Sequence, residues 1–288
     1  MRKALAIDVG GTKIYNAVID ENGTILSEVE KNNTPKTFVE LESLFKSIIA
    51  RYEDEVDVIA FATCGAVNNT NDGILGSTGN IAKEYPTMDF KSLSKKTVFV
   101  ENDANAAAWA EHVVGSSKGM AYSVMLTLGT GVGGGIILDN KLYKGKNGAA
   151  GEMHFKLRTD NHRKCTCGSF DCFEAYASGT GLKKTAEEIS GNPDITTYDV
   201  IEQKERPLMN KILEIWQNDI LAGIIGLANI FDPDCIVLSG SMADFVDIDY
   251  LEREANKEIV TTPFKIVKAS AGNYSGMIGA ALLALEAD

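Results

Sequence analysis

Positive charge is scarce in this sequence. Its 288 residues include 28 Lys and Arg against 40 Asp and Glu, which gives a formal net charge of −12. Polyanions such as nucleic acids and anionic membrane surfaces attract basic proteins and repel acidic ones, so both are poor partners for this chain. A phosphorylated ligand would have to be held by backbone N–H groups, helix N-termini and Mg²⁺ rather than by overall charge.

Long hydrophobic runs are absent as well. The two longest apolar stretches, Ile220–Ile230 and Met277–Leu285, are interrupted by glycine and fall short of the roughly 20 residues that a membrane-spanning helix needs. Residues 1–3 are too few for a signal peptide, because a strand pattern already begins at Leu5. We therefore expect a cytoplasmic protein without a membrane partner.

Cysteine is sparse, and the five cysteines are an odd number, which argues against a framework of disulfides. Three of them lie within eight residues, at Cys165, Cys167 and Cys172. Thiolates at this spacing suit a tetrahedral metal site that lacks one ligand, which His154 or His162 could supply. The alternative is a loop of buried thiols that binds no metal.

What the sequence does contain is an alternation of apolar strand patterns with helical patterns, which indicates parallel sheets covered by helices. Strands are expected at Ala4–Ile7, Ile14–Ile19, Thr24–Val29, Val56–Thr63, Thr97–Val100, Ala121–Leu128, Ile136–Leu138 and Cys235–Leu238. Helices are expected at Phe38–Tyr52, Asn102–Val114, Leu182–Ile189 and Pro207–Phe231, and from Tyr274 onward. The fold class is therefore α/β, and the chain is long enough for two domains with a cleft between them.

A faint internal repeat supports this division. The order strand, Gly/Thr turn, strand, Asp/Asn turn occurs in residues 5–23 and again in residues 121–141, as two similar α/β domains would produce. We predict an N-terminal domain of residues 1–117 completed by a C-terminal helix at about 275–288. Residues 118–274 would form the C-terminal domain, with a cysteine-rich loop at 154–174.

Two glycine-rich turns are candidates for phosphate binding. The first runs from Asp8 to Lys13, where paired glycines let backbone N–H groups approach a phosphate and Asp8 could hold Mg²⁺ through water. The second, Gly129–Gly135, has five glycines in seven residues, which is costly in an ordinary connection. The alternatives are a plain tight turn for the first and a glycine-rich hinge for the second. Neither matches a Walker or Rossmann phosphate loop.

A third motif, Glu101–Ala107, lies where a strand pattern gives way to a helix. A phosphoryl acceptor hydroxyl needs a carboxylate nearby to take its proton, which Asp103 could provide while Asn102 fixes a sugar beside it. The alternative is that these residues cap the helix, and one residue can fill both roles.

Together these residues resemble the ROK family of sugar kinases and repressors, which has the hexokinase/actin-like fold. The similarity runs nearly end to end, through D-V-G-G-T-K at 8–13, E-N-D-A-N-A-A-A at 101–108, L-G-T-G-V-G-G-G at 128–135, G-A-A-G-E at 148–152, the cysteine run at 165–175, A-S-G-T-G at 177–181 and the turn at 238–241. The resemblance implies two actin-like/hexokinase-type α/β domains and an ATP-dependent kinase acting on the 6-hydroxyl of a hexose.

The resemblance also implies residue roles. Asp103 would be the catalytic base, and the sugar would contact Gly65, Asn80, Asn102, Asp103, Glu152, His154 and Glu174. ATP, with Mg²⁺, would lie against Asp8, Gly10, Gly11, Thr12, Lys13, Thr130, Gly131 and Gly240. A structural Zn²⁺ would be held by Cys165, Cys167, Cys172 and His154. Members of the family are commonly dimers, which implies a homodimer.

Two departures from the family pattern bear on the zinc. The family reads G-E-x-G-H, whereas residues 151–155 read Gly-Glu-Met-His-Phe, so that one residue is missing between Glu152 and His154. In addition, Asp171 replaces the usual glycine before the third cysteine. The motif alone therefore does not fix the fourth ligand.

Among the family's substrates, the segment 102–111 and the approach 62–65 are most similar to bacterial N-acetylmannosamine kinases of sialic-acid catabolism, which make the 6-phosphate of an N-acyl-D-mannosamine. Glucokinase, fructokinase and β-glucoside kinase are alternatives, because discrimination at C2 rests on one or two contacts worth about 1–3 kcal/mol each.

A repressor is disfavoured because the first hairpin begins at Leu5, which leaves no room for a DNA-binding segment. A non-catalytic sugar sensor is disfavoured by Asp103 and the two glycine turns.

Overall fold

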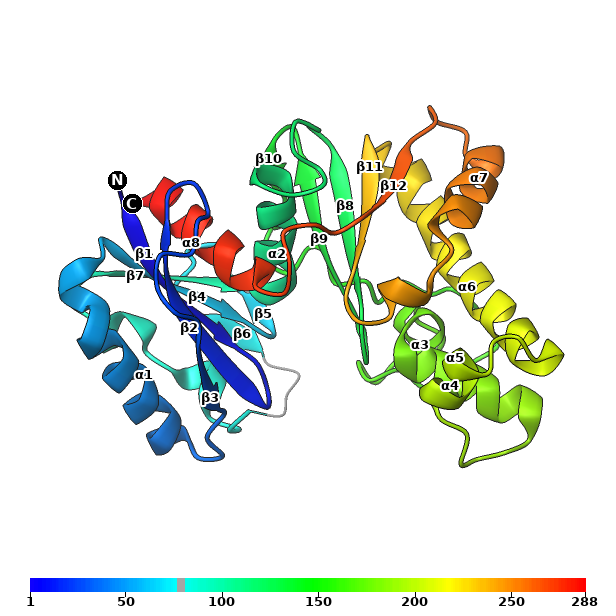
Figure 1. Ribbon diagram of the computed structural model, residues 1–288, viewed down its shortest axis with the longest axis horizontal. Helices are drawn as coiled ribbons and strands as arrows, with labels where there is room; N and C mark the ends of the chain where they lie inside the picture. Colours follow the sequence, from blue (N-terminus) through cyan, green and yellow to red (C-terminus); the bar gives the residue numbers. More distant parts are fainter. Residues whose placement is uncertain (77–80) are drawn as a thin grey trace. The chain divides into compact units, whose positions relative to one another are not determined.

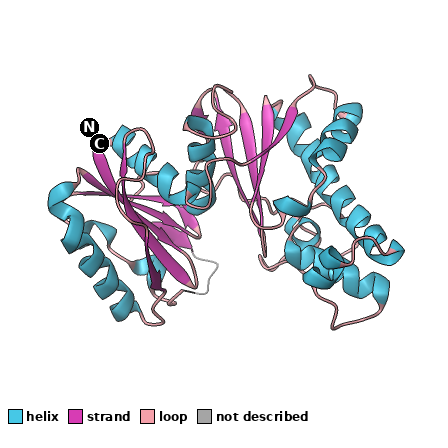
Figure 2. Ribbon diagram, in the orientation of Figure 1, coloured by secondary structure: helices cyan, strands magenta, loops and turns pink. Residues whose placement is uncertain are grey.

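The computed structural model of the chain describes residues 1–76 and 81–288 (Figure 1). Its contacts divide the chain into two compact units, the first formed by Met1–Gly119, Gly135–Gly151 and Ser270–Asp288 and the second by Met120–Gly134 and Glu152–Ala269. Residues 135–151, which our sequence-based division gave to the C-terminal domain, thus group with the first unit. Both units combine strands with helices (Figure 2), so the α/β class is confirmed.

The first unit is built on a five-stranded sheet with the order β3-β2-β1-β4-β7. Strand β1 (Lys3–Val9) forms an antiparallel hairpin with β2 (Lys13–Asp20), which pairs in turn with β3 (Glu30–Asn33). On its other side β1 pairs in parallel with β4 (Val58–Thr63), and β4 with β7 (Thr97–Asn102). The carboxyl ends of β1, β4 and β7 therefore meet at one edge of the sheet.

Helices cover both faces of this sheet. The large residues Leu5 and Ile7 of β1 pack in one apolar cluster with buried residues of α1 (Phe38–Tyr52). The alternate residues of β1 are alanines, and they pack on the opposite face with α2 (Asp103–Val113) and α8 (Ser275–Ala287). Small residues let α2 and α8 approach closely, because a Cβ at Gly279 would overlap the carbonyl oxygen of Ala106.

The second sheet has the order β10-β9-β8-β11-β12. Its strands are β8 (Ser123–Leu128), β9 (Val132–Leu138), β10 (Lys141–Leu142), β11 (Cys235–Ser239) and β12 (Lys265–Lys268). Strands β8, β11 and β12 are parallel, like β1, β4 and β7 of the first sheet. The division between the units falls inside β9. The matching strand orders agree with the internal repeat expected from the sequence.

The helices of the second unit are α3 (Glu174–Ala177), α4 (Gly179–Ser190), α5 (Thr197–Glu202), α6 (Pro207–Phe231) and α7 (Ile248–Glu258). The fully buried Trp216 of α6 donates its indole N–H to the carbonyl of Ala177 at 3.0 Å. Farther along α6, a Cβ at Gly223 would overlap the ring of Phe173. Helix α6 therefore holds α3 and the start of α4 in place.

The shorter elements are β5 (Ala66–Val67) and β6 (Ile74–Gly76), which pair with each other, and the 3₁₀ turns η1 (Glu53–Glu55), η2 (Tyr85–Thr87), η3 (Phe90–Leu93) and η4 (Ala243–Phe245). Over the described residues, no helix combines the length and apolar character needed to cross a membrane.

Two sequence-based expectations about strands are wrong. Thr24–Val29 is not a strand, because its backbone pairing stops at an isolated bridge between Ile25 and Ile19, after which the N–H of Val18 donates to the side-chain oxygen of Ser27 at 2.9 Å. The glycine turn expected at 129–135 is also shorter, since β9 begins at Val132. Gly135 lies inside that strand, where a Cβ would come within 2.5 Å of the Cβ of Ala108.

Candidate active site

The first unit brings two of the predicted functional carboxylates together. Asp8 lies near the end of β1, and Asp103 is the first residue of α2, directly after β7. Burial, and then the negative charge of Asp103, raise the pKa of Asp8 to about 7. The amino end of α8 reaches the same place, since a Cβ at Gly276 would lie 3.6 Å from Asp8 Oδ2 and from the Asp103 carbonyl oxygen.

Asn102 connects this carboxylate site with Gly65. Its Oδ1 accepts hydrogen bonds from the N–H groups of Ala104 and Asn105, each at 3.0 Å, so it is the N-cap of α2. Its Nδ2 donates to the carbonyl of Gly65 at 3.1 Å. Asp103 Oδ1 also accepts from the Ala104 N–H, at 2.9 Å. The capping alternative is therefore correct for Asn102, and the cap fixes Asp103 at a helix N-terminus, where negative charge is favoured.

The first glycine turn is braced from the end of β3. The Gly10 N–H donates to the carbonyl of Lys13 at 3.0 Å. Thr34 donates its N–H to the Thr12 carbonyl at 3.0 Å and its hydroxyl to the Gly10 carbonyl at 2.6 Å. The Lys13 ammonium donates to Asn33. Sequence reasoning missed Thr34, because its position depends on β3, which was expected elsewhere.

The second glycine turn lies against the start of α4. The N–H of Gly129 donates to the carbonyl of Gly131 at 3.0 Å and closes the turn. The hydroxyl of Thr180, in the first turn of α4, donates to the carbonyl of Thr130 at 2.8 Å. The amino end of α4, capped by Ser178, therefore adjoins the turn, which is the arrangement that binds phosphate groups elsewhere.

Glu174 joins the second glycine turn to the cysteine loop. Its Oε2 accepts from the N–H of Val132 at 3.1 Å, and a Cβ at Gly131 would come within 2.5 Å of that oxygen. Its Oε1 accepts from the hydroxyl of Thr166 at 2.5 Å and from the thiol of Cys165 at 3.5 Å. Gly131 is thus a glycine because the carboxylate of Glu174 occupies the space that a side chain would need.

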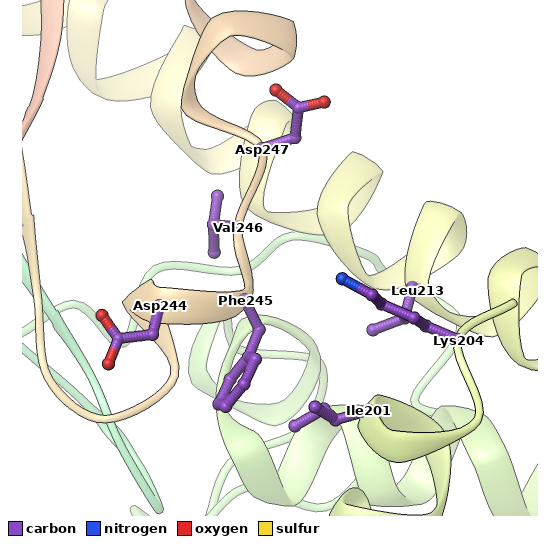
Figure 3. A pocket seen from close by; sticks show the side chains of 7 residues that line it. All are labelled: Ile201, Lys204, Leu213, Asp244, Phe245, Val246 and Asp247. Atoms are coloured by element: carbon purple, nitrogen blue, oxygen red, sulfur yellow. The ribbon is translucent and has the colours of Figure 1, made fainter.

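Gly240 lies directly after β11 with a φ of 87°, where a Cβ would overlap the carbonyl of Leu128. A few residues farther on is a cavity of about 250 Å³, lined by Ile201, Lys204, Leu213, Asp244, Phe245, Val246 and Asp247 (Figure 3). Phe245 projects from η4 toward α5, where Ile201 lies (Figure 3). Sequence reasoning missed this cavity, because its lining comes from α5, α6 and η4, which are not adjacent in the sequence.

The cysteine loop brings together four side chains that could bind a metal ion. His154 Nδ1 lies 3.5 Å from Cys165 Sγ, and the sulfur atoms of Cys167 and Cys172 are 3.6 Å apart. All four donor atoms lie within 4.8 Å of one another. These separations fit donors about 2.0–2.3 Å from a central zinc in a tetrahedral site. His154 reaches the cluster although the motif before it is one residue short.

The other predicted ligands near the cluster are also located. His162, the alternative fourth ligand, is directed to Glu188, with Nε2 and Oε1 3.2 Å apart. Glu152, a predicted sugar ligand, is exposed, and its Oε2 lies 3.7 Å from His154 Nε2. A carboxylate beside the second nitrogen of a metal-binding histidine orients the ring.

Asp171, the residue that departs from the family pattern, organises this loop. Its φ is 58°, in the left-handed region that glycine adopts freely and aspartate tolerates better than most residues. Its carboxylate accepts from the N–H groups of His162 at 3.1 Å and Arg163 at 2.8 Å and from the hydroxyl of Tyr176 at 2.7 Å. Burial raises the pKa of Asp171, but these hydrogen bonds outweigh it and hold the pKa well below its usual value.

The predicted site residues thus form two groups. Asp8, Gly10, Gly11, Thr12, Lys13, Gly65, Asn102 and Asp103 belong to the first unit, and Thr130, Gly131, Glu152, His154, Glu174, Gly240 and the three clustered cysteines to the second. The remaining predicted residue, Asn80, lies outside the described residues.

Comparisons with known proteins identify the family of the chain. Residues 4–287 match the ROK family. The glucokinase of Streptomyces coelicolor is 32% identical over 319 residues, covering 100% of this chain and 99% of the relative. The N-acetylmannosamine kinase of Yersinia pseudotuberculosis is 31% identical over 294 residues, covering 99% of each chain.

Among solved structures, the ROK family glucokinase from Streptomyces griseus, in complex with glucose and AMPPNP, is similar with a TM-score of 0.80 and 30% identity over 99% of each chain. The fold therefore belongs to the class of two-domain, hexokinase-type α/β proteins. Within that class, the chain is a member of the ROK family.

Proposed function

We propose that this protein is an ATP-dependent hexose 6-kinase. The observation that carries the proposal is Asp103, held at the amino end of α2 by the Asn102 cap, with Asp8 beside it. The sugar hydroxyl oxygen would bond to the γ-phosphorus of ATP as the bond from that phosphorus to the ADP oxygen breaks. The hydroxyl proton would pass to the Asp103 carboxylate.

The other roles implied by the resemblance are part of this proposal. Gly65, Asn102, Glu152, His154 and Glu174 would contact the sugar. The two glycine turns would donate N–H groups to the phosphates of ATP, and Asp8 would hold Mg²⁺ through water. Mg²⁺, when bound, would neutralise charge on the transferred phosphoryl group.

The cavity at η4 is our candidate for the nucleobase of ATP. It follows the Gly240 turn in the sequence, and its volume of about 250 Å³ and its aromatic Phe245 suit a flat heterocycle. The substitution Phe245→Ala would then raise the KM for ATP and leave the KM for the sugar unchanged.

For the sugar, we propose N-acetylmannosamine, from the similarity of residues 62–65 and 102–111 to kinases of that sugar. Glucose is the second candidate, since a glucokinase is as similar to this chain as an N-acetylmannosamine kinase is. Fructokinase and β-glucoside kinase activities are further alternatives within the same family.

A coupled assay of ADP release tests both levels of the proposal. The panel is N-acetylmannosamine, N-acetylglucosamine, glucose, fructose and mannose, with a reaction lacking sugar as the blank. We expect kcat/KM to be highest for N-acetylmannosamine, and a preference for glucose would favour the second candidate. Binding of a hexose without ADP release from any of them would contradict the kinase and favour a sugar-sensing member of the family.

We also propose a structural zinc at His154, Cys165, Cys167 and Cys172, based on the spacing of their donor atoms. When bound, the ion would crosslink the loop that carries Glu174 to the segment that carries Glu152. Metal analysis of the purified protein should give one zinc per chain, and Cys167→Ser should lose it. If the purified protein contains no zinc and also fails to bind added zinc, this site would be contradicted.

The remaining expectations concern assembly and location. We propose a homodimer in the cytoplasm that binds neither nucleic acid nor membranes. The measurement is light scattering coupled to size-exclusion chromatography, which should give twice the chain mass of 31.0 kDa.

A further inference from the structure

The carboxylate of Glu101 lies directly behind the proposed catalytic segment. Glu101 is in β7, immediately before Asn102, and its side chain is only 1% exposed. Its Oε1 accepts from the N–H of Asn102 at 2.8 Å and from Nδ2 of Asn105 at 3.2 Å. One oxygen of this carboxylate therefore binds both the residue that caps α2 and a residue of its first turn.

The other oxygen binds groups that are distant in the sequence. Oε2 accepts from Nδ2 of Asn71 at 2.8 Å and from the ammonium of Lys144 at 2.8 Å. Lys144 follows β10, is 15% exposed, and also donates to the carbonyl of Asn68 at 3.1 Å. These residues all belong to the first unit.

A second contact fixes the loop that carries Lys144. Asn69 Nδ2 donates to the carbonyls of Gly145 at 3.1 Å and Lys146 at 2.7 Å. A Cβ at Gly148 would overlap the carbonyl of Val67. The loop is therefore packed onto residues 67–69, and the ammonium of Lys144 is held where Glu101 needs a positive partner.

We propose that Lys144 is a positioning residue, which acts through Glu101 to set the start of α2 and the orientation of Asn102 and Asp103. A buried carboxylate without a cationic partner is costly, so a chain lacking the ammonium would move Glu101 toward water. This movement would release the Asn102 N–H and loosen the cap. The kinetic consequence rests on the proposed kinase function, whereas the structural consequence does not.

The experiment compares Lys144→Met and the milder Lys144→Gln with Lys144→Arg, which keeps the charge. Lys146→Met, an exposed lysine of the same loop, is the matched control. For Lys144→Met we expect kcat to fall at least tenfold, with the KM for ATP within twofold of the wild type. Lys144→Arg should recover at least half of kcat, and Lys146→Met should match the wild type.

Amide hydrogen exchange gives a readout that does not depend on turnover. In Lys144→Met and Lys144→Gln, the amides of Ala104 and Asn105 should exchange at least tenfold faster, while those of the last turn of α2 keep their rates. If the wild type releases no ADP, the proposed function fails, and this exchange pattern still decides the positioning role. Unchanged kcat and exchange in the two uncharged variants, or a uniform loss of protection across the first unit, would overturn the proposal.

Discussion

The two sheets of this protein share one strand order but differ in what their strand ends carry. Each has a hairpin followed by two parallel strands, β3-β2-β1-β4-β7 in one and β10-β9-β8-β11-β12 in the other. At the end of β1 and β7 the first unit places two carboxylates, Asp8 and Asp103. The second unit carries instead a loop of thiols with a histidine, which follows the hairpin of the second sheet in the sequence.

The two glycine turns also occupy similar places in the two sheets but contact different residues. The first is braced by Thr34, whereas the second is covered by Glu174 and the amino end of α4. The repeated strand order therefore determines where the turns lie, and the residues added around each turn determine its chemistry. This comparison predicts that a substitution behind one turn weakens its own unit and leaves the other intact.

The largest effect on stability is expected from Glu111, which secures the chain where it leaves and re-enters the first unit. This fully buried carboxylate accepts from the N–H groups of Ser116 at 2.7 Å, Ser270 at 2.9 Å and Ala271 at 2.7 Å. Glu111→Ala removes three hydrogen bonds to a charged acceptor from these partly buried and exposed residues, so we expect a loss of about 3–5 kcal/mol of unfolding free energy.

Urea unfolding measures this loss, and amide exchange assigns it to a unit. Glu111→Gln keeps one acceptor oxygen and should lose less. An equal loss of amide protection in both units of Glu111→Ala would contradict the prediction that a substitution weakens only its own unit.

A smaller, pH-dependent effect is expected from Asp8. Because its pKa is raised to about 7 when folded, the native protein keeps a proton that the unfolded chain releases near pH 4. This group's favourable contribution is present below pH 4 and is lost as the pH rises through 7. Asp8→Asn lacks this penalty, so above pH 7 it should be more stable than the wild type by roughly 2 kcal/mol, with little difference at pH 4.

The measurement is urea unfolding of both proteins from pH 4 to 8 without Mg²⁺. Asp54→Asn, which removes an exposed carboxylate of the same unit, should show no such trend. Parallel curves for the wild type and Asp8→Asn would show that folding does not raise the pKa of Asp8 and would contradict this prediction.

The smallest effect is expected from Asp171 in the second unit. Asp171→Gly keeps a residue suited to the φ of 58° and loses only the carboxylate's hydrogen bonds, so we expect the unfolding temperature to fall by only a few degrees. Asp171→Ala should lose more, since it adds strain in the left-handed region. Thermal unfolding ranks the two variants, and amide exchange should change over residues 162–172. Equal stability of Asp171→Gly and the wild type would leave the carboxylate without a structural role.

Elements with strong local signals could be predicted from the sequence. The helices Phe38–Tyr52 and Pro207–Phe231 have their expected bounds, because Thr37 caps the first through the Glu40 N–H and proline begins the second. Asn102 and Asp103 were found because a strand-to-helix junction rich in Asn and Asp is a local pattern. The helix α7 was missed, since its buried residues are few and most of its surface is polar.

Features that depend on distant partners could not be predicted. The Glu101–Lys144 pair joins residues 43 positions apart through packing of a loop on residues 67–69. The place of His154 in the cysteine cluster depends on how the backbone absorbs a missing residue, and the suitability of Asp171 depends on its positive φ. Neither is encoded in residue spacing.

The central claim is that Asp103 acts as the catalytic base, and one measurement tests this claim most directly. Turnover by Asp103→Asn is measured with the best hexose of the panel, alongside ADP binding by calorimetry. We predict that kcat falls about a thousandfold, within the range expected for loss of a general base, while ADP affinity and thermal stability stay near those of the wild type. Turnover within a few fold of the wild type in a folded Asp103→Asn protein would contradict the account.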